Sequence, residues 1–375
     1  MSEPLRVLYV AYALTQITPD SCGGTEQVLA TLLSEFAQPA YRWLETTTVA
    51  AAGSRVPGRL VSTNRGYWSH PLREEIVVHD AAQAIFGERH NAVASAELDR
   101  NAYDLVHNQG GTWYRRAGST RLPVLFTLHL PLAQYPPGVL DTLPENVYLQ
   151  LVSRSQSIHY AAHPRCLGYI GNGVDLEWFT PSERETGDYF LFLGRICPEK
   201  APHWAIAAAC RLRSRLVLAG RLHPFPAHVA YFRREIAPAL GGDVTWLPAP
   251  STSARRELLR GCRAVLLPSQ VEETSSLVAM EAAACGRPVV ATQRGALPEI
   301  VRQGETGLLA ATLDEFCHAA ARAPGLDSAA CRRAAEQEFD ARRMAAEYAT
   351  LYRQLASGEK NGAIARGRDR LELSR

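Results

Sequence analysis

Residues 268–292 read PSQVEETSSLVAMEAAACGRPVVAT and contain the pattern that decides the fold. An apolar run, RAVLLPS, ends at Ser269, and a polar loop follows it. Ser275 or Ser276 can cap a helix, which Gly286 would end because glycine readily adopts the left-handed conformation after a helix. A second apolar run, RPVVAT, comes directly after that helix. The stretch therefore predicts a strand–loop–helix–strand unit of an α/β sheet.

Apolar runs of the same kind recur along the chain in two series. The first series comprises RVLYVAY, TTTVAAAG, EEIVVHD, YDLVHNQ, PVLFTLHL and NVYLQLV, which start at residues 6, 46, 74, 103, 123 and 146. The second comprises YFLFLGRI, RLVLAG, VTWLPAP, RAVLLPS, RPVVAT and TGLLAA, which start at residues 189, 215, 244, 263, 287 and 306. Short, unalternating runs rich in Val and Leu suit strands that are buried on both faces. Two such series with helical patterns between them predict an α/β fold with two doubly wound, Rossmann-like domains.

The predicted boundary between the domains lies between about Ser155 and Gly173, where HPRC and GNG interrupt the chain. We expect a first domain over residues 1–160 and a second over residues 161–339. Ligands of such sheets bind at the carboxyl ends of the strands, so the cleft between the domains is the expected site. Residues 340–358 show helical spacing of apolar side chains, which predicts a terminal helix that packs back on the first domain. The polar tail, residues 359–375, is expected to be disordered.

The composition narrows the possible functions. With 375 residues and a formal net charge of +2, the chain lacks the basic excess of a nucleic-acid-binding protein. Its eight cysteines are scattered and form no CxxC pair, which is typical of reduced thiols in a cytoplasmic protein. No apolar run reaches the roughly 18 residues of a membrane span. The start, MSEPLRVLYVAYALTQ, is better explained by a first strand than by a signal peptide.

Two carboxylates, Glu273 and Glu281, flank the start of the helix in the opening stretch. Free N–H groups at a helix start suit a phosphate, and carboxylates accept hydrogen bonds from sugar hydroxyls. A ligand with a phosphate between two polyols, such as a nucleotide-sugar, fits this arrangement. Two solvated surface glutamates would give the same spacing, and the pair taken alone favours that interpretation.

The wider order of motifs is more specific. The strand, acidic loop, helix and Pro-Val-Val strand are followed by RGALPEIV and GETGLL. This order resembles the signature of retaining glycosyltransferases of family 4, which have the GT-B fold. The resemblance implies that Glu273 contacts the donor sugar and that Glu281 contacts the ribose. The donor-binding loop would also include Thr274, Ser275, Ser276 and Leu277.

The segment FLFLGRICPEKA, residues 190–201, resembles the first strand and turn of the family's second domain. The resemblance implies that Arg195 and Lys200 hold the diphosphate, because two fixed cations stabilise the negative charge of a leaving nucleoside diphosphate. The segment GNGVDLEWFTP resembles the family's interdomain segment, in which residues 172–175 have a structural role.

Glycines and a histidine of the first half complete the predicted site. Gly23 and Gly24 precede an amphipathic helix, where the backbone could approach an anion closely. The family's glycine-rich loop lies near the diphosphate and the acceptor. His107 and His129 each end an expected strand, a place where a histidine is commonly structural. The resemblance favours His129 as the residue that borders the donor sugar.

The chain departs from the family's pattern in two places. Residues 274–276 read Thr-Ser-Ser where family members commonly have Gly-Phe-Gly, and Ala201 stands where glycine is frequent. These departures bear on the identity of the donor more than on the class of reaction.

The resemblance implies a hexosyltransferase-type enzyme that moves a sugar, with retention, from a UDP-linked donor to an acceptor hydroxyl. No Asp-x-Asp pair occurs in the chain, so we expect a metal-independent reaction without cofactors. The acceptor stays open among a saccharide, a small molecule and a lipid-linked glycan. A nucleotide-sugar epimerase, a sugar phosphorylase and a non-catalytic nucleotide-sugar binding protein are the alternatives. The segments RGYWSHPLR and YFRR are weak indications of peripheral membrane contact.

Overall fold

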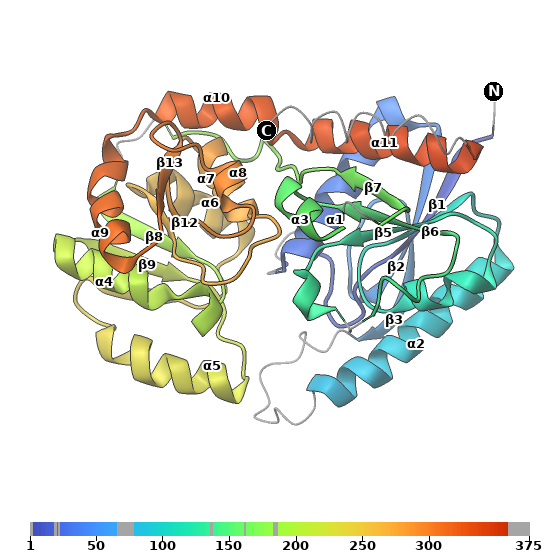
Figure 1. Cartoon of the computed structure of the whole chain (residues 1–375), viewed down its shortest axis with the longest axis horizontal. Helices are drawn as coiled ribbons and strands as arrows, with labels where there is room; N and C mark the ends of the chain where they lie inside the picture. The colour runs from blue at the N-terminus through green and yellow to red at the C-terminus, as the bar shows by residue number, and fades with distance from the viewer. Residues whose placement is uncertain are drawn as a thin grey trace. The chain divides into compact units, whose positions relative to one another are not determined.

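The computed structural model describes residues 3–18, 21, 23–65, 79–135, 138–160, 163–182 and 187–358 (Figure 1). The chain divides into two compact units. The first unit contains the described residues up to Asn172 and resumes at Ala341, and the second extends from Gly173 to Asp340. Each unit is built around its own sheet. Within the described ranges, no helix is long and apolar enough to cross a membrane.

The first unit has a seven-stranded sheet with parallel pairings. Its strands are β1 (Leu5–Val10), β2 (Leu44–Ala52), β3 (Arg59–Arg65), β4 (Leu105–Asn108), β5 (Val124–Leu128), β6 (Val147–Leu151) and β7 (Cys166–Tyr169). They lie in the order β3-β2-β1-β4-β5-β6-β7. The chain builds outward from β1 in both directions, which is the doubly wound arrangement.

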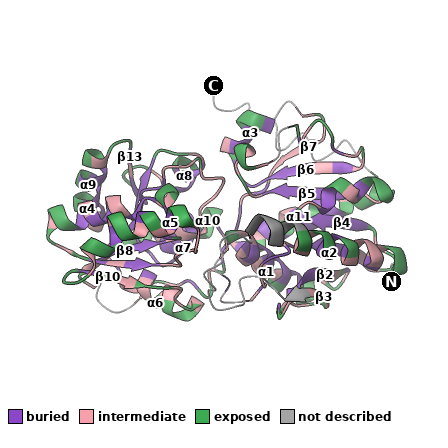
Figure 2. Ribbon diagram, turned by 90° about the horizontal axis from the view of Figure 1, so that it is seen from below, coloured by how far each residue is buried: buried purple, intermediate pink, exposed green. Residues whose placement is uncertain are grey.

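Helices and a large apolar cluster accompany this sheet. The α-helices are α1 (Gly24–Phe36), α2 (His79–Arg100), α3 (Arg154–Tyr160) and α11 (Ala341–Ser357), and the short 3-10 helices are η1 (Pro39–Tyr41), η4 (Trp113–Ser119) and η5 (Leu132–Gln134). Buried side chains of the central strands, such as Leu8, Val106 and Phe126, pack in one core with Trp113. In Figure 2, most of the ribbon of β5 has the colour of buried residues. The central strands β4 and β5 are buried without alternation because both of their faces are covered.

The second unit has a six-stranded parallel sheet in the order β10-β9-β8-β11-β12-β13. Its strands are β8 (Tyr189–Leu193), β9 (Arg215–Ala219), β10 (Val244–Leu247), β11 (Val265–Leu267), β12 (Val289–Thr292) and β13 (Gly307–Ala310). Alternate residues of β8 enter two different cores. Leu191 and Leu193 pack on one face of the sheet, and Phe190 and Phe192 pack on the other.

Seven α-helices of the described chain belong to the second unit, with three 3-10 helices and one π-helix. The α-helices are α4 (Pro202–Leu212), α5 (Pro226–Tyr231), α6 (Thr252–Gly261), α7 (Leu277–Ala284), α8 (Leu297–Ile300), α9 (Leu313–Arg322) and α10 (Ser328–Glu338). The others are η6 (Pro198–Lys200), η7 (Phe232–Ile236, the π-helix), η8 (Ala237–Ala239) and η9 (Ala323–Gly325). The predicted α/β architecture with two Rossmann-like sheets is confirmed.

The helix ends in the opening stretch follow from its sequence. Ser276 caps α7, because its Oγ accepts a hydrogen bond from the backbone N–H of Ala279 at 3.3 Å. Gly286, with a φ of 71°, follows the helix, and its amide donates to the carbonyl of Ala283 at 2.9 Å. The predicted cap and the predicted stop are both present.

The terminal helix α11 belongs to the first unit. Its buried face includes the residues predicted from helical spacing, namely Met344, Ala345, Tyr348, Leu351 and Tyr352. The Tyr9 hydroxyl of β1 donates to the Tyr352 hydroxyl at 3.0 Å. Arg343 donates to the carbonyls of Gly171 and Asn172 at 2.8 and 3.1 Å. Both contacts fasten the helix to the first unit.

The structure differs from the sequence predictions at both edges of the first sheet. The sequence patterns do not predict β3 or β7. The first unit ends at Asn172, after β7, within the predicted range of about Ser155 to Gly173. Most of the expected strand EEIVVHD lies in residues 74–78, outside the described residues, and its last two residues begin α2. The segment RGYWSHPLR, apart from its first residue, and the tail over residues 359–375 also lie outside them.

Candidate functional site

The carboxyl ends of β8 and β11 carry the loops that contain most of the predicted donor-site residues. After β9, a Cβ added to Gly220 would lie 1.8 Å from the carbonyl oxygen of Gly194, so only glycine permits this approach. The amide of Gly194 donates to the carbonyl of Ala219 at 3.0 Å. These contacts fix the backbone from which Arg195 extends, and Arg195 is exposed.

Lys200 and Glu273 meet at this edge of the sheet. The Lys200 ammonium forms an ion pair with Glu273 Oε1, and the Ser269 hydroxyl donates to the same oxygen at 2.5 Å. The Lys200 and Glu273 side chains are 26% and 14% exposed, so the pair is partly open to a ligand. The backbone amide of Gln270 donates to the Glu199 carbonyl at 2.7 Å, which fastens η6 to the loop after β11.

The backbone of Glu273 is held by a second loop. The amide of Ala296 donates to the Glu273 carbonyl at 2.7 Å. A Cβ added to Gly295 would lie 2.2 Å from that carbonyl oxygen, and Gly295 has a φ of 55°. Glycine at this position therefore allows the two loops to approach and positions Glu273 through its main chain.

The predicted donor loop runs from Glu273 into α7. The Ser276 hydroxyl is engaged in capping the helix. The Ser275 hydroxyl is buried without a hydrogen-bond partner among the described residues. Thr274 and Leu277 are only partly buried. A buried, unpartnered hydroxyl beside a helix start is a group that a ligand oxygen could satisfy.

Glu281 is the most deeply buried acid of the predicted site. Its side chain is 3% exposed, and Oε1 accepts a hydrogen bond from Arg255 Nη2 of α6 at 3.1 Å. Burial raises the pKa of Glu281, and the nearby Arg255 charge partly opposes that shift. Oε2 has no hydrogen-bond partner among the described residues. One oxygen is therefore neutralised by the protein, and the other can accept a hydrogen bond.

The glycine-rich start of α1 differs from the expected open anion site. A Cβ added to Gly23 would lie 1.8 Å from Glu26 Oε2, so the Glu26 carboxyl group folds back over the helix start before Gly24. Thr15 Oγ1 donates to Glu26 Oε1. Burial raises the pKa of Glu26. The first turn of α1 thus carries its own carboxyl group, which sequence reasoning missed.

His129 follows β5 in the first unit and is half-buried. Its Nε2 donates to Gln109 Oε1 at 2.6 Å. Burial lowers the pKa of His129 to about 4, so the imidazole is neutral near pH 7. Gln109 thereby fixes the tautomer that carries the proton on Nε2.

His107 has the alternative, structural role. Its Nδ1 lies 2.6 Å from the Tyr352 hydroxyl, and its Nε2 lies 2.7 Å from Thr127 Oγ1. The ring is fully buried, and burial lowers its pKa well below the ordinary value. Gln109 Nε2 lies 3.0 Å from His107 Nε2. His107 therefore joins the sheet to α11 and supports His129 through Gln109.

The predicted site residues are divided between the two units. The second unit contains Arg195, Lys200, Glu273, Thr274, Ser275, Ser276, Leu277 and Glu281, and the first contains Gly23, Gly24 and His129. The contacts among them join Lys200 to Glu273. Their supporting partners were missed in the sequence, namely Ser269, Arg255, Glu26 and Gln109. Of these four residues, only Ser269 could have been found from the sequence, because it lies in the Pro-Ser pair that ends a predicted strand.

A separate hollow lies at the opposite edge of the second sheet. Its volume is about 470 Å³, and Asp188, Arg263 and Pro288 are among its lining residues. These residues precede β8, β11 and β12, so the hollow lies at the amino ends of the strands. It is not part of the site formed at the carboxyl ends.

The chain has two parallel-sheet, Rossmann-like domains, which is the architecture of GT-B glycosyltransferases. Residues 187–323 match the family model described as "Glycosyl transferases group 1". The D-inositol 3-phosphate glycosyltransferase of Mycobacterium avium (strain 104) is 37% identical over 199 residues, which cover 48% of this chain and 46% of that protein. The chain spans about half the length of the curated relatives it matches.

Solved structures match nearly the whole chain. AviGT4, a glycosyltransferase involved in avilamycin A biosynthesis, is 25% identical, with a TM-score of 0.67 over 95% of this chain and 99% of that one. HepE of Anabaena, solved in complex with UDP-glucose, is 16% identical, with a TM-score of 0.67 over 96% and 100%. These similarities support a GT-B glycosyltransferase.

Proposed function

We propose that this chain is a retaining glycosyltransferase of family 4 type. It would transfer a hexose from a UDP-linked donor to an acceptor hydroxyl without using a metal ion. The observation that carries this proposal is the meeting of Lys200 and Glu273 at the carboxyl edge of the second sheet. The family match over residues 187–323 and the UDP-glucose bound to HepE support it.

The two cations of the site would act on the leaving group. Arg195 is exposed on a backbone fixed by the β8 and β9 ends, and Lys200 lies in the adjoining turn. As the sugar–phosphate bond breaks, negative charge develops on the diphosphate, and the two side chains stabilise it. This is the charge that a divalent metal supplies in enzymes that require one.

The two glutamates would divide the donor. Lys200 and Ser269 both bond to Glu273 Oε1, so Oε2 can accept a hydrogen bond from a hydroxyl of the transferred sugar. Glu281 Oε1 accepts a hydrogen bond from Arg255. Glu281 Oε2 has no partner among the described residues, so it would accept a hydrogen bond from a ribose hydroxyl. A carboxylate with one oxygen fixed by the protein presents the other in a defined direction.

His129 would border the transferred sugar as a hydrogen-bonding group. It is neutral near pH 7 because burial lowers its pKa to about 4, so it is not a proton donor in this proposal. Departure of the diphosphate and attack of the acceptor would occur on one face of the sugar. The leaving phosphate would take the acceptor proton, and the first unit would recognise the acceptor.

Incubation with UDP-glucose, UDP-galactose and GDP-mannose tests the proposal. The acceptors offered in the assay are simple saccharides and D-inositol 3-phosphate, the compound in the name of the mycobacterial relative. We expect release of UDP that depends on an acceptor, and a product whose anomeric configuration matches that of the donor. An inverted product would contradict the retaining mechanism. A changed sugar still linked to the nucleotide would indicate an epimerase, and binding without turnover would indicate a binding protein.

A further inference from the structure

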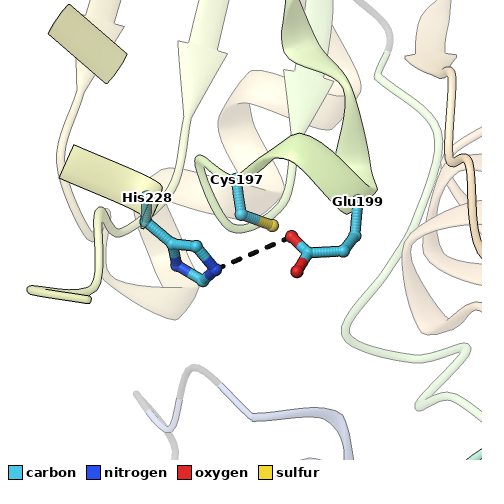
Figure 3. Close-up of side chains that lie close together, drawn as sticks. All are labelled: Cys197, Glu199 and His228. Atoms are coloured by element: carbon cyan, nitrogen blue, oxygen red, sulfur yellow. Dashed lines mark ion pairs between the residues drawn. The ribbon is translucent and has the colours of Figure 1, made fainter. Parts of the chain in front are cut away.

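A second group of polar side chains lies beside the turn that carries Lys200. It consists of Cys197, Glu199 and His228 (Figure 3). Cys197 directly precedes η6, Glu199 lies within η6, and His228 comes from α5. The cysteine sulfur, a carboxylate oxygen and an imidazole nitrogen all lie within 4.8 Å of one another. None of these three side chains has a role in the proposed transfer reaction.

We propose that this Cys–Glu–His group binds a Zn²⁺ ion. Thiolate sulfur, imidazole nitrogen and carboxylate oxygen are the ligands that zinc takes in proteins, and three of them leave a fourth position for water. Harder cations such as Mg²⁺ prefer oxygen ligands alone, so the donor set favours zinc over them. This site lies outside the transfer steps described above.

The spacing of the ligands suits a tetrahedral ion. Ordinary zinc bond lengths place the nitrogen and oxygen ligands about 3.4 Å apart and the sulfur and nitrogen ligands about 3.6 Å apart. His228 Nε2 lies 3.6 Å from Glu199 Oε2, which is close to the first of these values. All three ligand atoms lie within 4.8 Å of one another, so no pair has to approach by more than about 1 Å when an ion binds.

The three side chains differ in exposure: two are buried, and one faces solvent. Cys197 is fully buried and His228 is 7% exposed, whereas the Glu199 side chain is 46% exposed. The His228 ring packs edge-on against Phe225, with ring centres 5.0 Å apart. An ion can therefore approach past Glu199 and meet two ligands whose positions are set by packing.

The protonation of the group permits binding. His228 Nδ1 is buried without a hydrogen-bond partner among the described residues, so its proton can reside there and leave the Nε2 lone pair for the ion. Binding breaks the S–H bond of Cys197, forms an S–Zn bond and releases one proton to solvent, with no oxidation or reduction. Burial raises the pKa of Cys197 to about 11, so the ion's positive charge is what stabilises the thiolate.

Cobalt provides a direct test, because Co²⁺ occupies zinc sites and absorbs light in a way that reports thiolate ligation. The full chain, treated with EDTA and desalted, is titrated with Co²⁺ and then with Zn²⁺. We expect one Co²⁺ per chain, a sulfur-to-cobalt charge-transfer band, and loss of that band when Zn²⁺ is added. Cys197→Ser should remove the band, and Glu199→Gln and His228→Gln should each weaken Zn²⁺ binding by about 10-fold or more.

Two controls make the result decisive. Cys210→Ser replaces an exposed thiol of the same unit and should leave the band and the affinity unchanged. Because Cys197 is buried and its replacement can disturb folding, Glu199→Gln carries the test when its unfolding temperature in EDTA equals that of the wild type. Absence of the band in the wild type, its persistence in Cys197→Ser, or unchanged Zn²⁺ affinity in Glu199→Gln would each overturn the proposal. No nucleotide-sugar is used, so the outcome is independent of the proposed transferase activity.

Discussion

Replacing Arg255 by alanine tests the buried ion pair that supports Glu281. The Arg255 and Glu281 side chains are 13% and 3% exposed, and their charged atoms lie 3.1 Å apart. Removing one partner of such a pair leaves an uncompensated charge in the interior, which costs about 3 to 5 kcal/mol. We expect Arg255→Ala to lower the free energy of unfolding by this amount at pH 7.

The loss of stability in Arg255→Ala should become larger as the pH rises. Burial holds the pKa of Glu281 above its ordinary value of 4.5, so the folded chain binds this proton more tightly than the unfolded chain does. The contribution of Glu281 to stability is therefore fully present below pH 4.5 and is lost as the pH rises through the raised pKa. Without the Arg255 charge that pKa rises further, so the loss should be larger in Arg255→Ala.

Urea unfolding at several pH values measures this effect. Arg255→Ala/Glu281→Gln should recover much of the loss, because the double variant has no buried charge. Arg256→Ala is the matched control on the same helix. Arg256 pairs with the half-exposed Glu257, and its removal should cost about 1 kcal/mol or less. A cost of Arg255→Ala no greater than that of Arg256→Ala would refute the reasoning.

Four further predictions follow from named contacts. Arg195→Ala and Lys200→Ala should each lower kcat/KM by about 30- to 800-fold while the unfolding temperature stays unchanged; near-normal values would remove their assignment to the diphosphate. Transfer should survive EDTA, and a strict requirement for Mn²⁺ in the same assay would contradict the metal-independent mechanism. Ala201→Gly should raise the free energy of urea unfolding by up to about 1 kcal/mol, because Ala201 has a φ of 47°; a clear loss would mean that this φ is not strained. Tyr352→Phe should lower the free energy of urea unfolding by about 1 to 3 kcal/mol, because the Tyr352 hydroxyl bonds to buried His107. An unchanged free energy of unfolding would count against that bond.

The strands could be predicted from the sequence where their residues are buried on both faces of the sheet. The inner strands β8, β11 and β12 of the second sheet appear in the sequence as short apolar runs because both of their faces are covered. The helix α7 is bounded by Ser276 and Gly286, as its sequence predicts. The edge strands of the first sheet, β3 and β7, were not predictable in the same way. β3 reads RLVSTNR and β7 reads CLGY, and an edge strand that packs fewer neighbours needs no apolar run.

The residues of the candidate site could be predicted from the sequence, but the residues that hydrogen-bond to them could not. Glu273 and Lys200 stand in motifs that resemble a known family, and the structure joins them. Their supports come from distant parts of the chain. Arg255 reaches Glu281 because α6 packs beside α7, and Gln109 reaches His129 because β4 and β5 are neighbours. No local pattern encodes such contacts, since they depend on how helices and strands pack together.

Titration calorimetry with UDP is the most direct test of a donor site in the second unit. The wild-type chain should bind UDP. Glu281→Gln should lose a ribose contact worth about 1 to 3 kcal/mol, which is a weakening of about 5- to 150-fold. Glu273→Gln should bind UDP within about 2-fold of the wild type and lose turnover instead, because its contact is to the sugar. Equal weakening of UDP binding in both variants would contradict the proposed division of the donor, and no binding of UDP to the wild type would contradict the UDP-linked donor.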